Sequence, residues 1–267
     1  MSDSNEATAS TSTADSSGTQ RPRGVNYEAL KHHIVTHKID CGLWAIRVLA
    51  IILGFAYFIP IFGNSHNFYY KVLLANAAIN ALRLHQRVGR VTLSREFISA
   101  LLTEDSCHYL FYSLIFLYVA PLSLVLVPIL LFCMLHAASY SLTLLDTLGQ
   151  NSWWGARLLI SLVEFQSLNI LRAVAFTEIC LMPFTVVLIL MGRATLLTPF
   201  IYYHFLVQRY NSRRNPYTRN MFRELRMLSE STASKPNMPS FIRTIILSIV
   251  KFTCKLAPMP LQTPPQQ

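Results

Sequence analysis

The pattern of apolar and polar positions is dominated by one central stretch. Residues Tyr109–Leu135 carry no formal charge, and this run exceeds the ~20 residues that an apolar helix needs to cross ~30 Å of hydrocarbon. Pro121 and Pro128 interrupt it. The stretch therefore predicts either one long kinked helix or a hairpin with arms at 109–126 and 128–148. We favour the hairpin, turning near Pro128, because a single helix through the whole uncharged region would overshoot the bilayer.

Two further apolar segments, residues 43–62 and 173–192, are long enough to span a membrane. With the central stretch they predict an all-α polytopic membrane protein with three to four membrane helices. Arg47 lies just inside the first segment, and we expect its long side chain to reach the lipid headgroups. Glu178 lies inside the second segment, where a carboxylate is costly unless a polar group pairs with it. It is either a structural partner for another helix or part of an ion or proton path.

Shorter amphipathic segments surround these helices. Ser94–Leu102 has the pattern of a short helix at the membrane interface. The two acids that follow, Glu104 and Asp105, complement the helix dipole at the start of the central stretch. Thr195–Tyr210 is apolar and aromatic but short, which favours re-entry at the interface over crossing.

The C-terminal segment Ser240–Leu256 shows the clearest amphipathic pattern. Its polar positions recur at i, i+4, i+7 and i+11 and form one stripe: Thr244, Ser248, Lys251 and Lys255. The opposite side is apolar: Phe241, Ile242, Ile245, Ile249, Phe252 and Leu256. A basic stripe opposite a wide apolar face is typical of a helix lying in the plane of a lipid surface. A core helix or a partner-binding helix has the same pattern, so these interpretations stay open.

These elements divide the chain into a membrane domain, residues 25–210, and a peripheral C-terminal part. The latter comprises a basic cytoplasmic linker at 211–239 and the amphipathic helix at 240–257. Residues 1–24 are rich in Ser and Thr and hold almost no large apolar side chains, and residues 258–267 form a tail rich in Pro and Gln. We predict that both ends are disordered, because such segments bury too little apolar surface to offset the entropy of ordering.

Composition and charge support the membrane assignment. Of 267 residues, 52% are hydrophobic and only 13% are charged, whereas soluble domains carry about 25% charged residues. The mean hydropathy of +0.38 agrees. The net charge is +10, which on a membrane protein indicates cytoplasmic loops and anionic lipid rather than nucleic acid.

The basic excess is greatest after the last membrane segment. Eleven of the 23 Lys and Arg residues follow Arg172, so the C-terminal part is predicted to be cytoplasmic in the hairpin and the single-helix arrangements alike. Charge does not distinguish these two arrangements. We expect the following side chains to contact lipid or a partner: Arg209, Arg213, Arg214, Arg219, Arg223, Lys251, Lys255, Phe241, Ile245, Ile249 and Phe252.

Motifs of catalysis and metal binding are missing from the sequence. It contains no GxSxG elbow, P-loop or HExxH motif. His33 and His37 are spaced i, i+4, but no acidic or cysteine ligand completes a zinc site at the usual spacing. We therefore expect no catalytic residue, no metal and no cofactor.

Several sequence words are specific enough to indicate a family. They are LLANAAINALRLHQR (Leu73–Arg87), EDSCHYLFYSLIF (Glu104–Phe116), LLFCMLHAASY (Leu130–Tyr140), EICLMP (Glu178–Pro183), PFIYYHFLVQRYNSRRNPY (Pro199–Tyr217) and FRELR (Phe222–Arg226). Because these motifs occur in the order found in that family, the chain resembles the transmembrane protein 33 family, which includes pore-membrane proteins. The resemblance implies residence in the endoplasmic reticulum membrane and nuclear envelope. It also implies links to reticulon-type proteins, nuclear pore components or stress sensors, and it carries no catalytic residues.

The leading hypothesis is thus a non-enzymatic membrane protein of the endoplasmic reticulum and nuclear envelope that shapes or organises membrane. Short hairpin arms and interfacial helices would act as wedges that expand the cytoplasmic leaflet. The alternative is a small channel or transporter that uses Glu178 inside the membrane.

Overall fold

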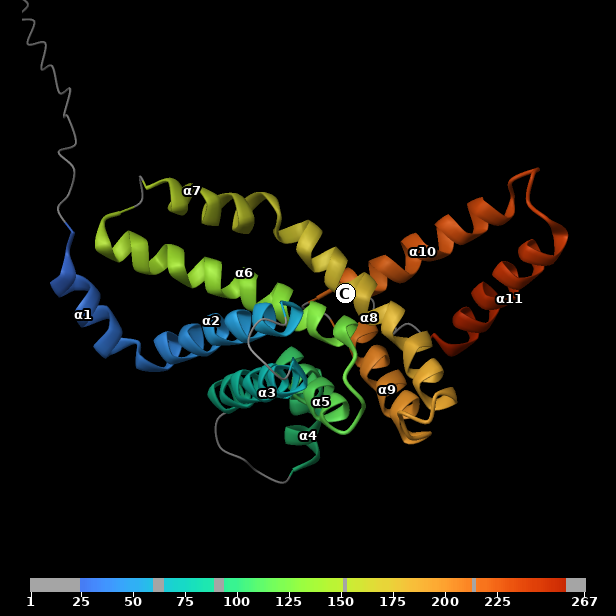
Figure 1. Ribbon diagram of the computed structural model, residues 1–267, viewed down its shortest axis with the longest axis horizontal. Helices are drawn as coiled ribbons and strands as arrows, with labels where there is room; N and C mark the ends of the chain where they lie inside the picture. Colours follow the sequence, from blue (N-terminus) through green and yellow to red (C-terminus); the bar gives the residue numbers. More distant parts are fainter. Residues whose placement is uncertain (1–24, 60–64, 89–93, 151–152, 213–214, 258–267) are drawn as a thin grey trace, which may run out of the picture.

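The computed structural model describes residues 25–59, 65–88, 94–150, 153–212 and 215–257. In this part of the chain every regular element is helical and no strand is present (Figure 1). The helices are α1 (Tyr27–Thr36), α2 (Lys38–Phe58), α3 (Ser65–Val88), α4 (Arg95–Thr103), α5 (Asp105–Leu117), α6 (Ser123–Leu148), α7 (Trp154–Ile160), α8 (Ser167–Leu190), α9 (Leu197–Asn211), α10 (Tyr217–Ala233) and α11 (Ser240–Leu256). A π-helical turn, Ser161–Phe165, joins α7 to α8. The predicted all-α class is confirmed, and the two tails predicted to be disordered lie outside the described residues.

Three of these helices are long and apolar enough to cross a membrane: α2 with 21 residues, α6 with 26 and α8 with 24. They agree with the lower end of the predicted three to four membrane helices. α2 and α6 run antiparallel, because Trp44 donates a hydrogen bond to Ser141 at one end and Tyr57 is hydrogen-bonded to Ser123 at the other. α6 ends at Gly149, whose φ of 74° is the left-handed conformation that glycine adopts most readily.

The central uncharged stretch forms two helices, but the break is not where we predicted it. α5 and α6 are separated by residues 118–122, which include Pro121, whereas Pro128 lies inside α6. The predicted arms 109–126 and 128–148 are therefore wrong, and so is the single kinked helix. α5 has 13 residues and is about 20 Å long, which is too short to cross a bilayer by itself.

Tertiary contacts explain why the chain turns at the first proline and not at the second. Either proline removes a helical hydrogen bond. Next to Pro121, the Ala120 N–H donates to the Arg193 carbonyl at 3.4 Å, and the Tyr112 hydroxyl donates to the Val125 carbonyl in the first turn of α6 at 2.9 Å. These bonds hold the turn and the start of α6, while membrane-type helices tolerate an internal proline such as Pro128.

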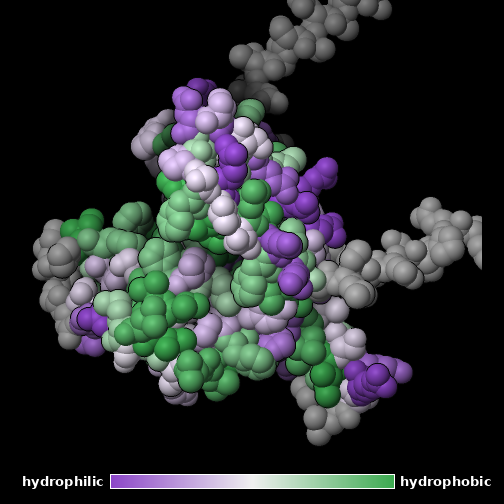
Figure 2. All heavy atoms as spheres, turned by 90° about the vertical axis from the view of Figure 1, so that its right-hand side faces the viewer, coloured by the Kyte–Doolittle hydropathy of each residue, from purple (hydrophilic) through white to green (hydrophobic). Residues whose placement is uncertain are grey.

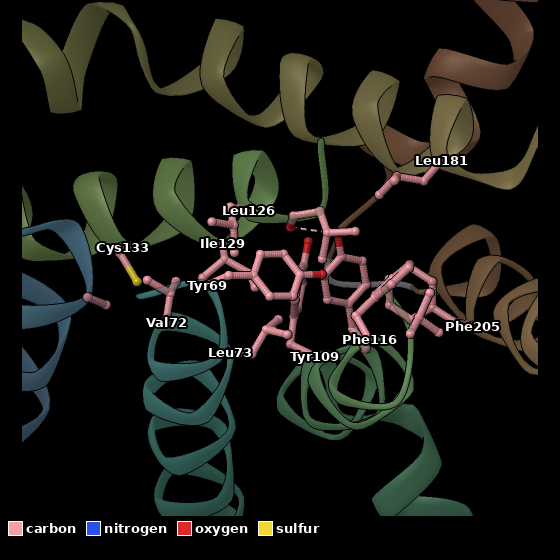
Figure 3. Packing of buried hydrophobic residues seen from close by; sticks show 14 of the residues in the cluster. Tyr69, Val72, Leu73, Tyr109, Phe116, Leu126, Ile129, Cys133, Leu181 and Phe205 are labelled. Carbon is pink, nitrogen blue, oxygen red and sulfur yellow. Dashed lines mark hydrogen bonds between the residues drawn. The ribbon is translucent and has the colours of Figure 1, made fainter. Parts of the chain in front are cut away.

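The apolar core lies where α2, α3, α5 and α6 meet, and α8 and α9 extend it. Figure 3 shows part of it, with Leu126 and Ile129 of α6 next to Tyr69 of α3. α2 and α6 approach closely at Gly54, where an added Cβ would lie 2.4 Å from the Leu130 Cδ2 atom. A small residue at such a crossing lets two helices pack at short distance.

Arg47 of α2 does not reach the headgroups from an exposed position. The residue is only 5% exposed and packs inside the bundle. The prediction that its side chain reaches the lipid headgroups does not agree with this burial, because α3 and α6 cover this side of α2.

The region predicted as a linker, residues 211–239, is largely the helix α10. The short polar segment between α10 and α11 reverses the chain, and α11 packs back on α10. Figure 1 shows the two as a hairpin that projects from the helical bundle. The amphipathic helix predicted at 240–257 is observed as α11.

Candidate functional site

A buried polar cluster surrounds Glu178 in the middle of α8. Glu178 is 0% exposed, and its Oε2 atom lies 3.2 Å from Nε of Arg209 on α9. The Tyr109 hydroxyl of α5 donates to Oε1, and the Thr218 hydroxyl of α10 donates to Oε2 at 3.3 Å. The Tyr202 hydroxyl of α9 donates to the Glu178 main-chain carbonyl at 2.8 Å. Side chains from four helices thus meet at one carboxylate.

Arg209 links this carboxylate to a second acid at the start of α5. Its Nη1 atom lies 3.2 Å from Oδ1 of Asp105, which also accepts a hydrogen bond from the Ser212 hydroxyl at 3.0 Å. The guanidinium lies over the Tyr109 ring, 5.1 Å from its centroid. The buried cation thus contacts two carboxylates and an aromatic ring, which meets the need of a buried charge for partners.

Helical spacing brings these residues to the same place. On α9, Tyr202, Leu206 and Arg209 follow one another at i, i+4 and i+7 and are all buried, so they form one stripe. On α5, Asp105 and Tyr109 are spaced i, i+4. The two stripes face each other across the core, and α8 supplies Glu178 between them.

The electrostatics agree with this pairing. Burial alone lowers the pKa of Arg209, but the charges of Glu178 and Asp105 outweigh burial and raise it. Burial and the nearby Glu178 carboxylate hold the pKa of Tyr109 well above its ordinary value. Tyr109 therefore stays protonated and acts as a hydrogen-bond donor, and Arg209 stays charged.

The prediction that Arg209 contacts lipid or a partner is wrong. The residue is 1% exposed and makes its polar contacts inside the protein. Its place at the end of an aromatic helix next to a basic run suggested a surface arginine, but it is the internal partner of Glu178. This geometry agrees with the interpretation of Glu178 as a structural partner for another helix.

The other predicted basic side chains lie on α10 and α11. Arg219 and Arg223 are exposed one turn apart on α10, and Lys251 and Lys255 are exposed on α11. Arg213 and Arg214 lie outside the described residues. The predicted apolar contacts of α11 are also exposed: Phe241, Ile245, Ile249 and Phe252.

Sequence reasoning missed the partners of Glu178, although two signals pointed to them. The first signal is that a carboxylate in an apolar helix needs a cation or hydrogen-bond donors as partners. The second is that few arginines in this chain lie on a helix face that is otherwise apolar and aromatic. Arg209 follows Tyr202 at i+7, which places it on the packed face of its helix. Asp105, Tyr109 and Thr218 could not be chosen by spacing, because the contacts join four separate helices.

Comparisons with known proteins assign the family. The family model described as "Transmembrane protein 33/Nucleoporin POM33" matches residues 22–259. The chain is 55% identical to Krueppel homolog 2 of Drosophila melanogaster over 229 residues, which cover 86% of this chain and 82% of that protein. It is 43% identical to transmembrane protein 33 of Rattus norvegicus over 239 residues, covering 89% of this chain and 97% of the relative.

A more distant relative is similar over the same length. The transmembrane protein 33 homolog of Caenorhabditis elegans is 37% identical over 238 residues, covering 87% of this chain and 86% of that protein. No solved structure matches the chain. The chain therefore belongs to the transmembrane protein 33/nucleoporin POM33 family.

Proposed function

We propose that this chain is a non-enzymatic protein that shapes or organises the membrane of the endoplasmic reticulum and nuclear envelope. The observation that carries the proposal is the apolar face of α11, which no other described element covers. The family description, with its mention of a nucleoporin, supports a nuclear envelope location. Links to nuclear pore components, reticulon-type proteins or stress sensors belong to the same proposal.

The contacts that α11 makes with α10 leave its apolar face uncovered. Ile246 and Val250, which are half-buried, mark the side that packs toward α10. The predicted apolar face lies elsewhere around the helix, and Phe241 and Phe252 on it are 73% and 62% exposed. An uncovered apolar face of this width costs free energy in water, and a lipid surface would cover it.

Positive charge next to this face favours an anionic lipid surface. Lys251 and Lys255 flank the apolar face of α11, and both are exposed. Arg219 and Arg223 are exposed on α10 and form no ion pair among the described residues. Each Lys or Arg near an anionic leaflet contributes about 1 kcal/mol to binding.

The distribution of charge supports a cytoplasmic position for α10 and α11. One end of the bundle holds the start of α5 together with Arg83, Arg87 and Arg209. Arg87 of α3 pairs with Glu104 at 2.9 Å, and Arg209 of α9 pairs with Asp105. At the other end, Ala120 bonds to the carbonyl of Arg193 in the segment after α8. The end with more positive charge is cytoplasmic by the positive-inside rule.

A second apolar surface fits a wedge in the membrane. The turn from α8 to α9 exposes several large apolar side chains: Phe184, Val186, Val187, Leu190, Met191, Leu196, Leu197 and Phe200. Figure 2 shows one face of the molecule, with hydrophobic surface in its lower middle part, many hydrophilic side chains toward the top and smaller hydrophilic groups at the lower edges. α9 has 15 residues, about 22 Å, so it supports the predicted re-entry rather than a full crossing.

Site-directed spin labelling of the full chain in liposomes tests the position of α11. We compare nitroxide labels at Ile249→Cys and Lys251→Cys, each with Cys254→Ser. If α11 lies on lipid, the label at 249 is accessible to oxygen, whereas the label at 251 is accessible to a water-soluble nickel chelate. Equal access of the chelate to both labels would contradict the lipid position.

Charge reversal separates lipid from a protein partner. Lys251→Glu combined with Lys255→Glu should reduce the oxygen accessibility of the label at 249 in anionic liposomes but not in detergent. Arg157→Glu on α7, which is also exposed, is the matched control. An unchanged label in the double variant would point to a partner protein in place of lipid.

The alternative of a channel or transporter using Glu178 is less well supported. The carboxylate has protein partners at both oxygens and is fully buried. An ion path needs the group to exchange between accessible states. Ion flux in reconstituted vesicles that disappears in Glu178→Gln would favour the alternative.

A further inference from the structure

A basic cavity lies inside the helical bundle, apart from the Glu178 carboxylate. Its volume is about 190 Å³. Four arginines from three helices line it: Arg47 of α2, Arg83 and Arg87 of α3, and Arg209 of α9. Asp105 is the acidic residue among the side chains that line it. No function described above uses this cavity.

Ion pairs account for only half of this positive charge. Arg209 is paired with Glu178 and Asp105, and Arg87 is paired with Glu104. Arg47 and Arg83 have no acidic oxygen within 4.0 Å among the described residues. Asp40, on α2 before Arg47, is exposed. Arg47 and Arg83 therefore line the cavity without an ion-pair partner in the described part of the chain.

Arg47 carries a second, independent sign of an anion site. The residue is buried, and its Nη2 atom has no hydrogen-bond partner among the residues that the structure describes. A buried donor without a partner costs about 1–3 kcal/mol, and more when it is charged. Burial and, to a smaller extent, the neighbouring Arg87 also lower the pKa of Arg83, while Asp40 raises it.

The cavity wall is held by polar contacts that the anion need not supply. Asn76 donates to the Ser113 hydroxyl at 2.8 Å, and Asn80 donates to the Asn76 carbonyl at 2.8 Å. The first bond joins α3 to α5, and the second lies within α3, the helix that carries Arg83 and Arg87. A site on packed helices positions its ligand more rigidly than a site on loops.

We propose that this cavity binds a phosphate group through Arg47 and Arg83. Guanidinium groups match phosphate oxygens with two parallel hydrogen bonds, and the volume suits one phosphate group with its nearest substituents. The source is either the headgroup of an anionic membrane lipid, which α2 and α6 would meet in the bilayer, or a free phosphate. The inference does not rest on the proposed role of α11.

Thermal unfolding of the full chain in a neutral detergent tests the site. We add dihexanoyl phosphatidic acid, inorganic phosphate or dihexanoyl phosphatidylcholine and follow tryptophan fluorescence. A ligand that binds only the folded state raises Tm with concentration. A rise with phosphatidic acid alone indicates a lipid headgroup, and a rise with inorganic phosphate as well indicates a phosphate site open to soluble ions. If neither probe raises Tm, or phosphatidylcholine acts as strongly, the proposal is overturned.

Variants then locate the binding. In Arg47→Gln with Arg83→Gln, the apparent Kd for the active probe should rise at least ~10-fold, which corresponds to ~1.4 kcal/mol. Arg157→Gln, which removes an exposed arginine of α7, should leave Kd unchanged. Lys251→Glu with Lys255→Glu should also leave it unchanged, which separates this site from α11. A double arginine variant that binds as tightly as the unmodified chain would contradict the proposal.

Stability of the variants is part of the test. Removing an uncompensated buried charge should not lower Tm without ligand, so Arg47→Gln alone should unfold at the same temperature or higher. A fall of Tm in Arg47→Gln would show that Arg47 has an internal partner and would overturn its assignment. The single variant Arg83→Gln, at a half-buried position, then measures how much Arg83 contributes to phosphate binding while Arg47 is unchanged.

Discussion

The Glu178 cluster and the α10–α11 hairpin place the same residue types in opposite surroundings. Arg209 is 1% exposed and balanced by two carboxylates. Arg219 and Arg223 follow in the same basic run of the sequence but are exposed on α10. The neighbours of each arginine, and not its position in a basic run, decide whether it is buried in an ion pair or exposed.

The two regions are also expected to contribute differently, the cluster to the packing of the helices and α11 to contact with the membrane. The cluster joins α5, α8, α9 and α10 through bonds that exclude water, so it fixes how the bundle packs. α11 has no buried residue and contributes little to the core. Changes in the cluster should therefore alter stability, whereas changes in α11 should alter membrane contact.

The largest expected effect comes from breaking the buried ion pair. Glu178→Gln keeps the side-chain shape but leaves Arg209 with Asp105 alone, and we expect a loss of about 3 kcal/mol in the free energy of unfolding. Denaturation in mixed micelles followed by circular dichroism measures it. Glu224→Gln, which breaks the exposed pair with Arg172, is the control and should cost less than ~1 kcal/mol. Equal losses would remove the distinction between the two regions.

Tyr109→Phe should have the second largest effect. It removes the hydroxyl that donates to the Glu178 carboxylate, a charge-assisted bond in a buried site, and should cost about 1.5–3 kcal/mol. Tyr203→Phe removes an exposed bond to the Leu256 carbonyl and should be nearly neutral. The same micelle denaturation compares the two variants, and a neutral Tyr109→Phe would argue against a tight cluster.

A smaller effect should appear with pH through His108, next to the cluster. Burial lowers the pKa of this imidazole, and the charge of Arg209 lowers it further. Above pH ~6.5 both folded and unfolded states are neutral, so the residue has no effect. As pH falls below this value, the unfolded state takes up a proton that the folded state does not. Stability then falls by at most ~1.4 kcal/mol per pH unit until the lowered pKa is reached.

The variant His108→Gln isolates this contribution. The difference in Tm between pH 7.5 and pH 5.5 should be smaller in the variant than in the unmodified chain, because the variant lacks the group that titrates. His204→Gln on α9 is the matched histidine control. An identical pH dependence in all three proteins would show that His108 is not held neutral.

The smallest effect on stability is expected on α11. Ile249→Ser with Phe252→Ser should change the free energy of unfolding in detergent by less than ~0.5 kcal/mol, as exposed sites usually do. The same variant should weaken contact with anionic liposomes in the spin-label experiment. A large loss of stability in detergent would mean that α11 belongs to the core.

Most helices could be predicted from the sequence. The long apolar runs predicted α2 and α8, and the amphipathic patterns of Ser94–Leu102 and Ser240–Leu256 predicted α4 and α11. Ser94 was expected at a helix start, and its side chain accepts a hydrogen bond from the Phe97 N–H. These features are local, because each depends on residues a few positions apart.

Other features depended on distant residues. The prediction of a turn near Pro128 followed from the length of the uncharged stretch, which would overshoot the bilayer as one helix. Both prolines disrupt a helix, and the contacts with the Arg193 and Val125 carbonyls favour a turn at Pro121. The helix α10 was missed because its residues are polar on most sides. Its buried side chains Thr218 and Met221 acquire their role only by packing on the bundle.

The sequence by itself determined that this protein enters a membrane, is helical, ends in an amphipathic helix and contains a carboxylate that needs a partner. Hydrophobicity, helical period and the cost of a buried charge act along the chain, so they can be deduced from residue order. Only the tertiary structure decided that Arg209 is that partner and that Arg47 and Arg83 face a cavity. Such side chains come from helices far apart in sequence. The free energy of folding depends on which charged groups are buried next to one another, and residue order alone does not give this.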